Sequence, residues 1–227
     1  MKYLANHYYH IYNRGVNHQP IFQTRRHYIF FLQKTKRYCQ QHHISLLAWC
    51  LMPNHYHFLI RNEEDGNPTR FLQTLCNSYV QAYNKETGRK GQLFERGAKA
   101  KVVDSDEYVM LVARYIHLNP VKTRLVTAPE EWEFSNFQEW IGIRNGTMFN
   151  KNFTQEYFSP EEYREFVQQD IKKTQKARLE RYIKFFTFQI VHFSLEKVCL
   201  ANYLTPTLQI LQSVRIAIQP FQGSVLY

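Results

Sequence analysis

Residues 44–60 read ISLLAWCLMPNHYHFLI, and this stretch decides the fold. Residues 44–51 form an apolar run that predicts a buried strand, and residues 55–60 predict a second strand. The short break at Met52-Pro53-Asn54 favours an antiparallel pair, although Pro53 is also compatible with a bulge inside one long strand. The centre of the fold is therefore expected to be a sheet.

The elements on either side of this pair predict an α+β domain. Strand candidates lie at residues 7–14 and 99–103, and helix candidates at residues 24–41, 69–85 and 104–119. Asp104 and Glu107 resemble a capping box at the start of the last helix. We expect this helix to end near Asn119, because Pro120 disfavours an α conformation in the residue before it. The order β-α-β-β-α-β-α predicts a mostly antiparallel central sheet flanked by helices.

The character of the chain changes from about Asn145 onward. We therefore assign residues 1–144 to the main domain and residues 145–227 to a C-terminal extension of uncertain role. The sequence Ser159-Pro160-Glu161-Glu162 resembles a helix start, with proline at the first helical position, so an additional C-terminal helical segment is expected. Residues 171–184 carry six basic side chains, which indicates either a DNA-binding face or a solvated charged face.

The composition favours a polyanionic partner. The 227 residues include 29 Lys and Arg against 19 Asp and Glu, a formal net charge of +10. Such an excess favours binding to nucleic acid but does not separate DNA from RNA, or an enzyme from a binding protein. The four cysteines form no CxxC pair, which argues against a zinc ribbon. The sequence also lacks 18 uninterrupted apolar residues and an apolar signal core, so we expect a cytoplasmic protein without a membrane partner.

Two histidines in the second strand could hold a metal ion. His55 and His57 are two positions apart, and such residues of a strand point to the same face. Two adjacent imidazoles suit one divalent metal ion, with Tyr56 facing the opposite side. A single HxH pattern is, however, more often incidental than a metal site.

A tyrosine and an amide are spaced for one helix face. Tyr115 and Asn119 are four residues apart, which makes them neighbours on a helix surface. A tyrosine nucleophile needs a nearby cation, since its usual pKa is near 10. The alternative is that Tyr115 belongs to the core and that Asn119 only ends the helix. Tyr79 and Tyr83 are rival nucleophiles, but neither has a metal-binding residue four positions later.

Several motifs together resemble the HUH single-tyrosine, IS200-like transposases, and within them the REP-associated tyrosine transposases. The resemblance covers about residues 3–142. Its motifs are YHIYNRG near the N-terminus, AWCLMPNHYHFLI, GQLFERGAKA, YIHLN followed by Pro120, and WEFSNF at residues 132–137. The individual motifs are modest, but their combination and order are specific. The resemblance implies a ferredoxin-like HUH endonuclease fold for the α+β domain.

The resemblance also implies roles for particular residues. His55 and His57 would bind Mg²⁺ or Mn²⁺, Asn119 would be the third protein ligand, and Tyr115 would attack single-stranded or hairpin DNA to form a 5′-phosphotyrosine. Relatives often have glutamine where Asn119 stands, and asparagine keeps the amide oxygen. Relatives also commonly have an aromatic residue inside the run that reads Arg96-Gly97-Ala98-Lys99 here, so one base-stacking contact could be missing.

The DNA contacts are expected to come from basic residues around this site: Arg14, Arg89, Lys90, Arg96, Lys99 and Lys122. The extension could add a DNA-binding or homodimer element. Two rival functions are a domesticated nucleic-acid-binding regulator without catalysis and a replication or conjugation nickase. The nickases usually place the tyrosine before the histidine pair or in tandem, whereas here the tyrosine follows it.

Overall fold

The computed structural model describes residues 2–148, 153 and 157–172. The chain divides into two compact units, Met1–Gln169 and Asp170–Tyr227. The first unit holds every strand and labelled helix described below. Among the described residues, no helix is long and apolar enough to cross a membrane.

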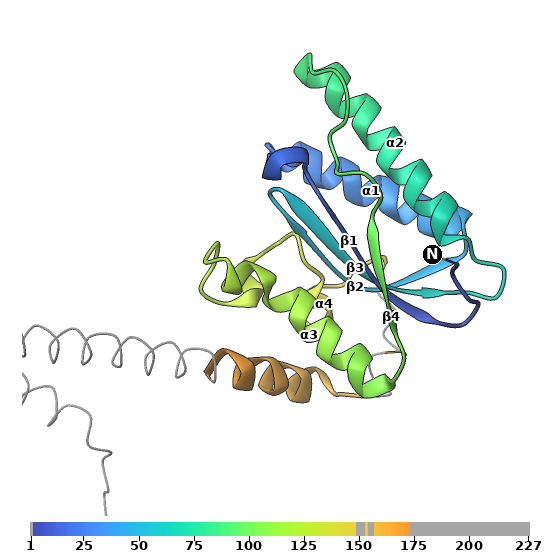
Figure 1. Cartoon of the computed structure of the whole chain (residues 1–227). Coiled ribbons are helices and arrows are strands. Elements are labelled where there is room, and N and C mark those ends of the chain that lie inside the picture. The colour runs from blue at the N-terminus through green and yellow to red at the C-terminus, as the bar shows by residue number, and fades with distance from the viewer. Residues whose placement is uncertain (1, 149–152, 154–156, 173–227) are drawn as a thin grey trace, which may run out of the picture. The chain divides into compact units, whose positions relative to one another are not determined.

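A four-stranded antiparallel sheet forms the centre of the first unit (Figure 1). Its strands are β1 (Tyr8–Arg14), β2 (Ile44–Met52), β3 (His55–Asn62) and β4 (Lys99–Val103), in the order β2-β3-β1-β4. β2 and β3 are antiparallel neighbours joined by Pro53 and Asn54, so the hairpin is confirmed and the single bulged strand is excluded.

The helices lie on both faces of this sheet. α1 (Arg25–Gln41) and α2 (Pro68–Thr87) cover one face, and α3 (Asp106–Lys122) lies on the other (Figure 1). The short elements η1 (Val16–His18), η2 (Pro129–Glu131) and α4 (Phe137–Trp140) complete the unit. The expected α+β class, with a mostly antiparallel sheet flanked by helices, is confirmed.

Alternation along β3 explains why the two faces differ. Tyr56 and Phe58 are fully buried beneath α1, where the Phe31 ring packs 5.3 Å from the Tyr56 ring and 6.2 Å from the Phe58 ring. These residues belong to the large aromatic core of the unit. His55 and His57 alternate with these two residues along the strand and therefore point to the opposite face, on the side of α3. One hairpin thus supplies both the core and the polar face.

Both predicted ends of α3 were wrong. The helix begins at Asp106, and its N-cap is Ser105, whose side chain accepts a hydrogen bond from the Tyr108 amide. It also continues through Pro120 to Lys122. Pro120 lacks the N–H that would bond to the Ile116 carbonyl, and the Asn119 side-chain amide reaches that carbonyl at 3.5 Å. This contact helps the helix to continue through the proline.

A further helical segment at residues 160–172 confirms the helix start expected there. Ser159 and Glu162 form a reciprocal capping box, since each side chain accepts from the other's backbone N–H. Tyr163 on this segment is buried and lies 2.7 Å from Nδ1 of His117 in α3. The segment up to Gln169 therefore packs within the first compact unit.

Candidate active site

The two histidines of β3 lie side by side on the sheet face toward α3. The ring centroids of His55 and His57 are 5.0 Å apart, with the rings perpendicular. His57 is buried and His55 is partly exposed. The pair thus sits at the boundary between the packed core and solvent, where an ion or a phosphate can approach.

One nitrogen of each ring is already engaged. His55 Nδ1 is 2.6 Å from the side-chain oxygen of Asn54, and because an amide oxygen only accepts, Nδ1 must carry the proton. His57 Nδ1 is 3.0 Å from Nε2 of His10 on β1. Because His55 carries its proton on Nδ1, its Nε2 atom keeps the lone pair that a metal ligand requires.

Burial keeps all three imidazoles neutral at pH 7. It lowers the pKa of His55, with a smaller effect from Arg14, and lowers the pKa of His57 well below its ordinary value. The pKa of His10 falls to about 4, first because of burial and then because of the positive charge of Lys101. Neutral imidazole is the form that binds a metal ion, so this cluster is suited to one.

Tyr115 on α3 faces this histidine cluster. Its ring meets the rings of His57 and His10 edge to face, at centroid distances of 5.7 and 5.8 Å. The Tyr115 side chain remains 42% exposed, so it can reach a large substrate. Lys122, two turns later on α3, places its ammonium 5.0 Å from the centre of the Tyr115 ring.

Asn119 lies one helical turn after Tyr115. It is buried, and its side-chain amide donates to the main-chain oxygen of Tyr115 at 2.8 Å. The amide nitrogen is therefore committed to the helix backbone. The side-chain oxygen is the atom that a metal ion would use.

The imidazoles of His55 and His57 and the side-chain oxygen of Asn119 are the groups that would hold a divalent ion. The described residues contain no group of three or more His, Cys, Asp or Glu arranged around a common point. A site of two neutral imidazoles and an amide oxygen from Asn119 differs from such a cluster. It offers nitrogen and oxygen donors and leaves other positions for phosphate oxygens.

Basic residues of β4 lie on the histidine face, which is the face of the sheet that carries His10, His55 and His57. In the antiparallel register, Lys101 lies opposite His10 and Lys99 opposite Tyr12, and both lysines are exposed. Arg14 forms an ion pair with Glu95, so part of its charge is already balanced. The charges of Lys101 and Arg14 both act on the histidine cluster, that of Lys101 on His10 and that of Arg14 on His55.

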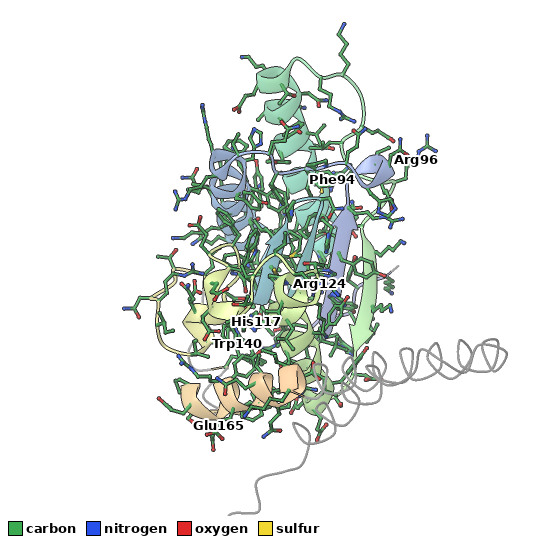
Figure 2. All side chains as sticks on the ribbon, turned by 90° about the vertical axis from the view of Figure 1, so that its left-hand side faces the viewer. Phe94, Arg96, His117, Arg124, Trp140 and Glu165 are labelled. Carbon is green, nitrogen blue, oxygen red and sulfur yellow. The ribbon has the colours of Figure 1, made fainter. Side chains whose placement is uncertain are left out.

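The basic residues that follow α2 lie in two different places. The C-terminal end of α2, after which Arg89 and Lys90 follow, projects away from α3 (Figure 1). Figure 2 shows Phe94 and Arg96 above His117 and Trp140. Arg96 follows Glu95, whose carboxylate pairs with Arg14, the residue opposite His55 in the sheet. Except for Lys172, the second predicted basic stretch, residues 172–184, lies outside the described residues.

The sequence reasoning missed His10 and Lys101. The signal was present in YHIY, because strand alternation places His10 on the same face as Tyr8 and Tyr12. Only the pairing of β1 with β3 brings that face beside the histidines, and this pairing is a long-range contact. Lys101 could have been found from Lys99 by the same two-residue spacing.

The two rival tyrosines lie on the opposite side of the sheet. Tyr79 and Tyr83 are buried in the aromatic core between α1 and α2. The Tyr79 hydroxyl donates to the main-chain oxygen of Ile21 at 2.5 Å, and burial raises the pKa of Tyr79. Neither tyrosine is placed to reach the histidine cluster.

Comparisons with known proteins agree with this architecture. The family model described as "Transposase IS200 like" matches residues 3–119. A protein of Haemophilus influenzae that is named as a REP-associated tyrosine transposase is 25% identical over 119 residues, which cover 47% of this chain and 66% of that protein.

A solved structure of a REP-associated tyrosine transposase bound to a REP hairpin also has this fold. It aligns with a TM-score of 0.54 and 15% identity, over 66% of this chain and 95% of that one. At this identity the likeness concerns the fold alone. Because the family model matches more than half of the sequence, from β1 through Asn119, the chain belongs to the family of IS200-like transposases.

Proposed function

We propose that this protein cuts and rejoins single-stranded DNA, using Tyr115 as the nucleophile and a divalent metal ion held by His55, His57 and Asn119. The observation that carries the proposal is the position of Tyr115. It is an exposed tyrosine whose ring contacts the buried His57, on a helix that also presents Asn119 one turn later. An ordinary core tyrosine would not remain 42% exposed beside such a cluster.

A bound Mg²⁺ or Mn²⁺ would polarise the scissile phosphate and balance the charge that develops on it. The residues of the chain have separate tasks in the same step. His55 and His57 hold their lone pairs in place from a rigid strand, and Lys122 places a positive charge close to the Tyr115 ring. This charge favours binding of the DNA phosphate that Tyr115 attacks.

The proposed reaction is a transesterification. The Tyr115 oxygen forms a bond to phosphorus as the bond between phosphorus and the 3′ oxygen breaks. The phenol loses its proton and the departing 3′ oxygen gains one, so a 5′-phosphotyrosine and a free 3′-hydroxyl result. A 3′-hydroxyl of another strand can reverse the step at a new junction, because the phosphotyrosine retains the energy of the phosphodiester.

The proposed substrate is single-stranded or hairpin DNA. A net charge of +10 and the exposed Lys99 and Lys101 on the histidine face favour a phosphate backbone. The related structure with a REP hairpin supports a hairpin substrate for this chain as well. A duplex would hide the bases that specify the site, whereas a single strand presents them.

The second candidate function is a nucleic-acid-binding regulator that has kept the fold without the chemistry. It shares the basic surface but requires neither a metal ion nor the Tyr115 hydroxyl. A replication or conjugation nickase would share the chemistry. The position of Tyr115 after the histidine pair favours the transposase-type enzyme.

The deciding experiment is a covalent-adduct assay. The full chain is incubated with single-stranded DNA hairpins from the genomic sequence on either side of its gene, with Mn²⁺ or with EDTA, and analysed on a denaturing protein gel. We expect a shifted protein band with Mn²⁺ only. Tyr115→Phe should bind the DNA normally and give no band, because it removes only the hydroxyl. Tyr108→Phe on the same helix is the matched control and should still form the adduct.

Two results would contradict the proposal in different ways. An adduct formed by Tyr115→Phe would place the nucleophile elsewhere. Tight DNA binding by the wild type without any adduct, on every hairpin strand and with Mn²⁺ or Mg²⁺, would favour the regulator.

A further inference from the structure

We infer that His10 is a positioning residue, which accepts a hydrogen bond from Nδ1–H of His57 and so leaves the Nε2 lone pair of His57 free for the metal ion. The inference deepens the proposed function and rests on it for the purpose of the contact. The contact itself is a feature of the folded protein without metal or DNA.

The geometry of the sheet brings the two rings together. In the β1–β3 register Tyr12 lies directly opposite His57, and His10 is the diagonal neighbour two residues away on the same face. The His10 and His57 rings stack with centroids 5.2 Å apart, and His10 Nε2 is 3.0 Å from His57 Nδ1. Both side chains are buried, so water competes little for this hydrogen bond.

The direction of the hydrogen bond decides whether His57 can be a ligand. If His57 donates from Nδ1, its Nε2 keeps a lone pair. If His10 donates instead, the His57 proton resides on Nε2 and that nitrogen cannot bind a cation. Metal-binding histidines generally donate their other ring N–H to a fixed acceptor, which sets both the tautomer and the ring orientation.

The neighbouring histidine follows the same arrangement with a different acceptor. His55 donates its Nδ1–H to the side-chain oxygen of Asn54 at 2.6 Å. Each member of the pair thus has its own partner at Nδ1, Asn54 in the turn and His10 on the adjacent strand. His10 also contacts the Tyr115 ring edge-on at 5.8 Å, so one residue touches both a metal ligand and the nucleophile.

The first test uses metal-free wild-type protein. Two-bond ¹H–¹⁵N correlation spectra distinguish the two tautomers of each histidine ring. We expect His57 to be protonated on Nδ1 and His10 to be unprotonated on Nε2. Protonation of His57 on Nε2 would overturn the inference, whether or not the protein cleaves DNA.

The second test separates positioning from packing. His10→Phe keeps a ring of similar size without an acceptor, whereas His10→Gln can place its side-chain oxygen where Nε2 stood. We expect His10→Phe to weaken Mn²⁺ binding in calorimetry by about 10- to 100-fold, and His10→Gln to recover most of the loss. His43→Asn, which removes an exposed imidazole at a left-handed backbone position, is the control and should bind Mn²⁺ as the wild type does.

The outcomes separate this inference from the proposed function. Equal Mn²⁺ affinities of His10→Phe and His10→Gln would show that acceptance at this position is unimportant and would overturn the inference. If the wild type has the expected His57 tautomer but forms no adduct with DNA, the proposed function fails and the positioning contact stands. If the wild type has the opposite tautomer and still forms the adduct, the positioning role fails and the proposed function stands.

Discussion

Asn119 donates its side-chain amide hydrogen to the main-chain oxygen of Tyr115, one helical turn earlier, at 2.8 Å. The same amide reaches the Ile116 oxygen, which Pro120 leaves without its usual helical partner. The Asn119 side chain therefore contacts the backbone of the proposed nucleophile and also carries the amide oxygen that would bind the metal. Its nitrogen supports the helix, and its oxygen is the proposed ligand atom.

We predict that Asn119→Ala lowers both activity and stability. The adduct should form more slowly and require more Mn²⁺, but it should not vanish, because Tyr115 and the two histidines remain. Loss of the amide hydrogen bonds should reduce the free energy of unfolding by about 1 kcal/mol. Adduct formation across a Mn²⁺ titration and urea unfolding measure the two effects.

Asn119→Gln provides a matched comparison. It keeps the amide oxygen but moves it by one methylene, so it should recover part of the metal response. A normal Mn²⁺ requirement in Asn119→Ala would remove this residue from the ligand set.

Replacing the histidine pair should have a larger effect. We predict that His55→Gln and His57→Gln each lower the rate of adduct formation by more than about 100-fold, since losing only a hydrogen-bond partner of a ligand costs about 10- to 100-fold. Binding of hairpin DNA in EDTA should be unchanged, because it depends on the basic surface. Single-turnover adduct assays and fluorescence anisotropy report the two properties, and metal-independent cleavage by either variant would refute the assignment.

Local patterns were enough for much of this fold and site. The hairpin of β2 and β3, the shared face of His55 and His57, and the spacing of Tyr115 and Asn119 all depend on neighbours in the chain. The i, i+2 and i, i+4 periods carry that information directly.

Local sequence patterns failed where the structure depends on contacts between distant segments, or on a side chain that replaces a missing backbone hydrogen bond. His10 reaches His57 only because β1 pairs with β3 in one register, which no local pattern specifies. The end of α3 was wrong because the rule for the residue before proline does not include a side chain that compensates, as that of Asn119 does. The contribution of residues 160–169 to the first unit also depends on long-range contacts such as Tyr163 with His117.

The buried contact of Tyr163 leads to a stability prediction. His117 Nε2 lies 2.9 Å from the Asn136 side-chain oxygen and must donate to it, so Nδ1 accepts from the Tyr163 hydroxyl. Tyr163→Phe leaves a buried acceptor unpaired and should lower the free energy of unfolding by about 1–3 kcal/mol. Urea unfolding should show this loss, with the exposed Tyr108→Phe as the neutral control. An unchanged midpoint in Tyr163→Phe would mean that the hydrogen bond between Tyr163 and His117 adds little to the stability of the first unit.

The two groups of basic residues should differ in what they do for DNA. Lys99 and Lys101 flank the histidine face, whereas Arg89 and Lys90 follow the far end of α2 (Figure 1). We predict that Arg89→Glu/Lys90→Glu weakens binding to all DNA targets alike and flattens the salt dependence, by about one unit of slope for each phosphate that the protein no longer neutralises. Lys99→Glu/Lys101→Glu should weaken binding in the same way and also slow adduct formation at saturating DNA, because these lysines lie beside His10 and Tyr12.

Binding measured at several salt concentrations, together with single-turnover adduct formation, distinguishes the two double variants. Arg37→Glu on the exposed side of α1 is the control for charge alone and should change the salt slope least. An unchanged slope in Arg89→Glu/Lys90→Glu would exclude this loop from the DNA footprint. A normal single-turnover rate in Lys99→Glu/Lys101→Glu would mean that β4 contributes charge to binding without guiding the strand to Tyr115.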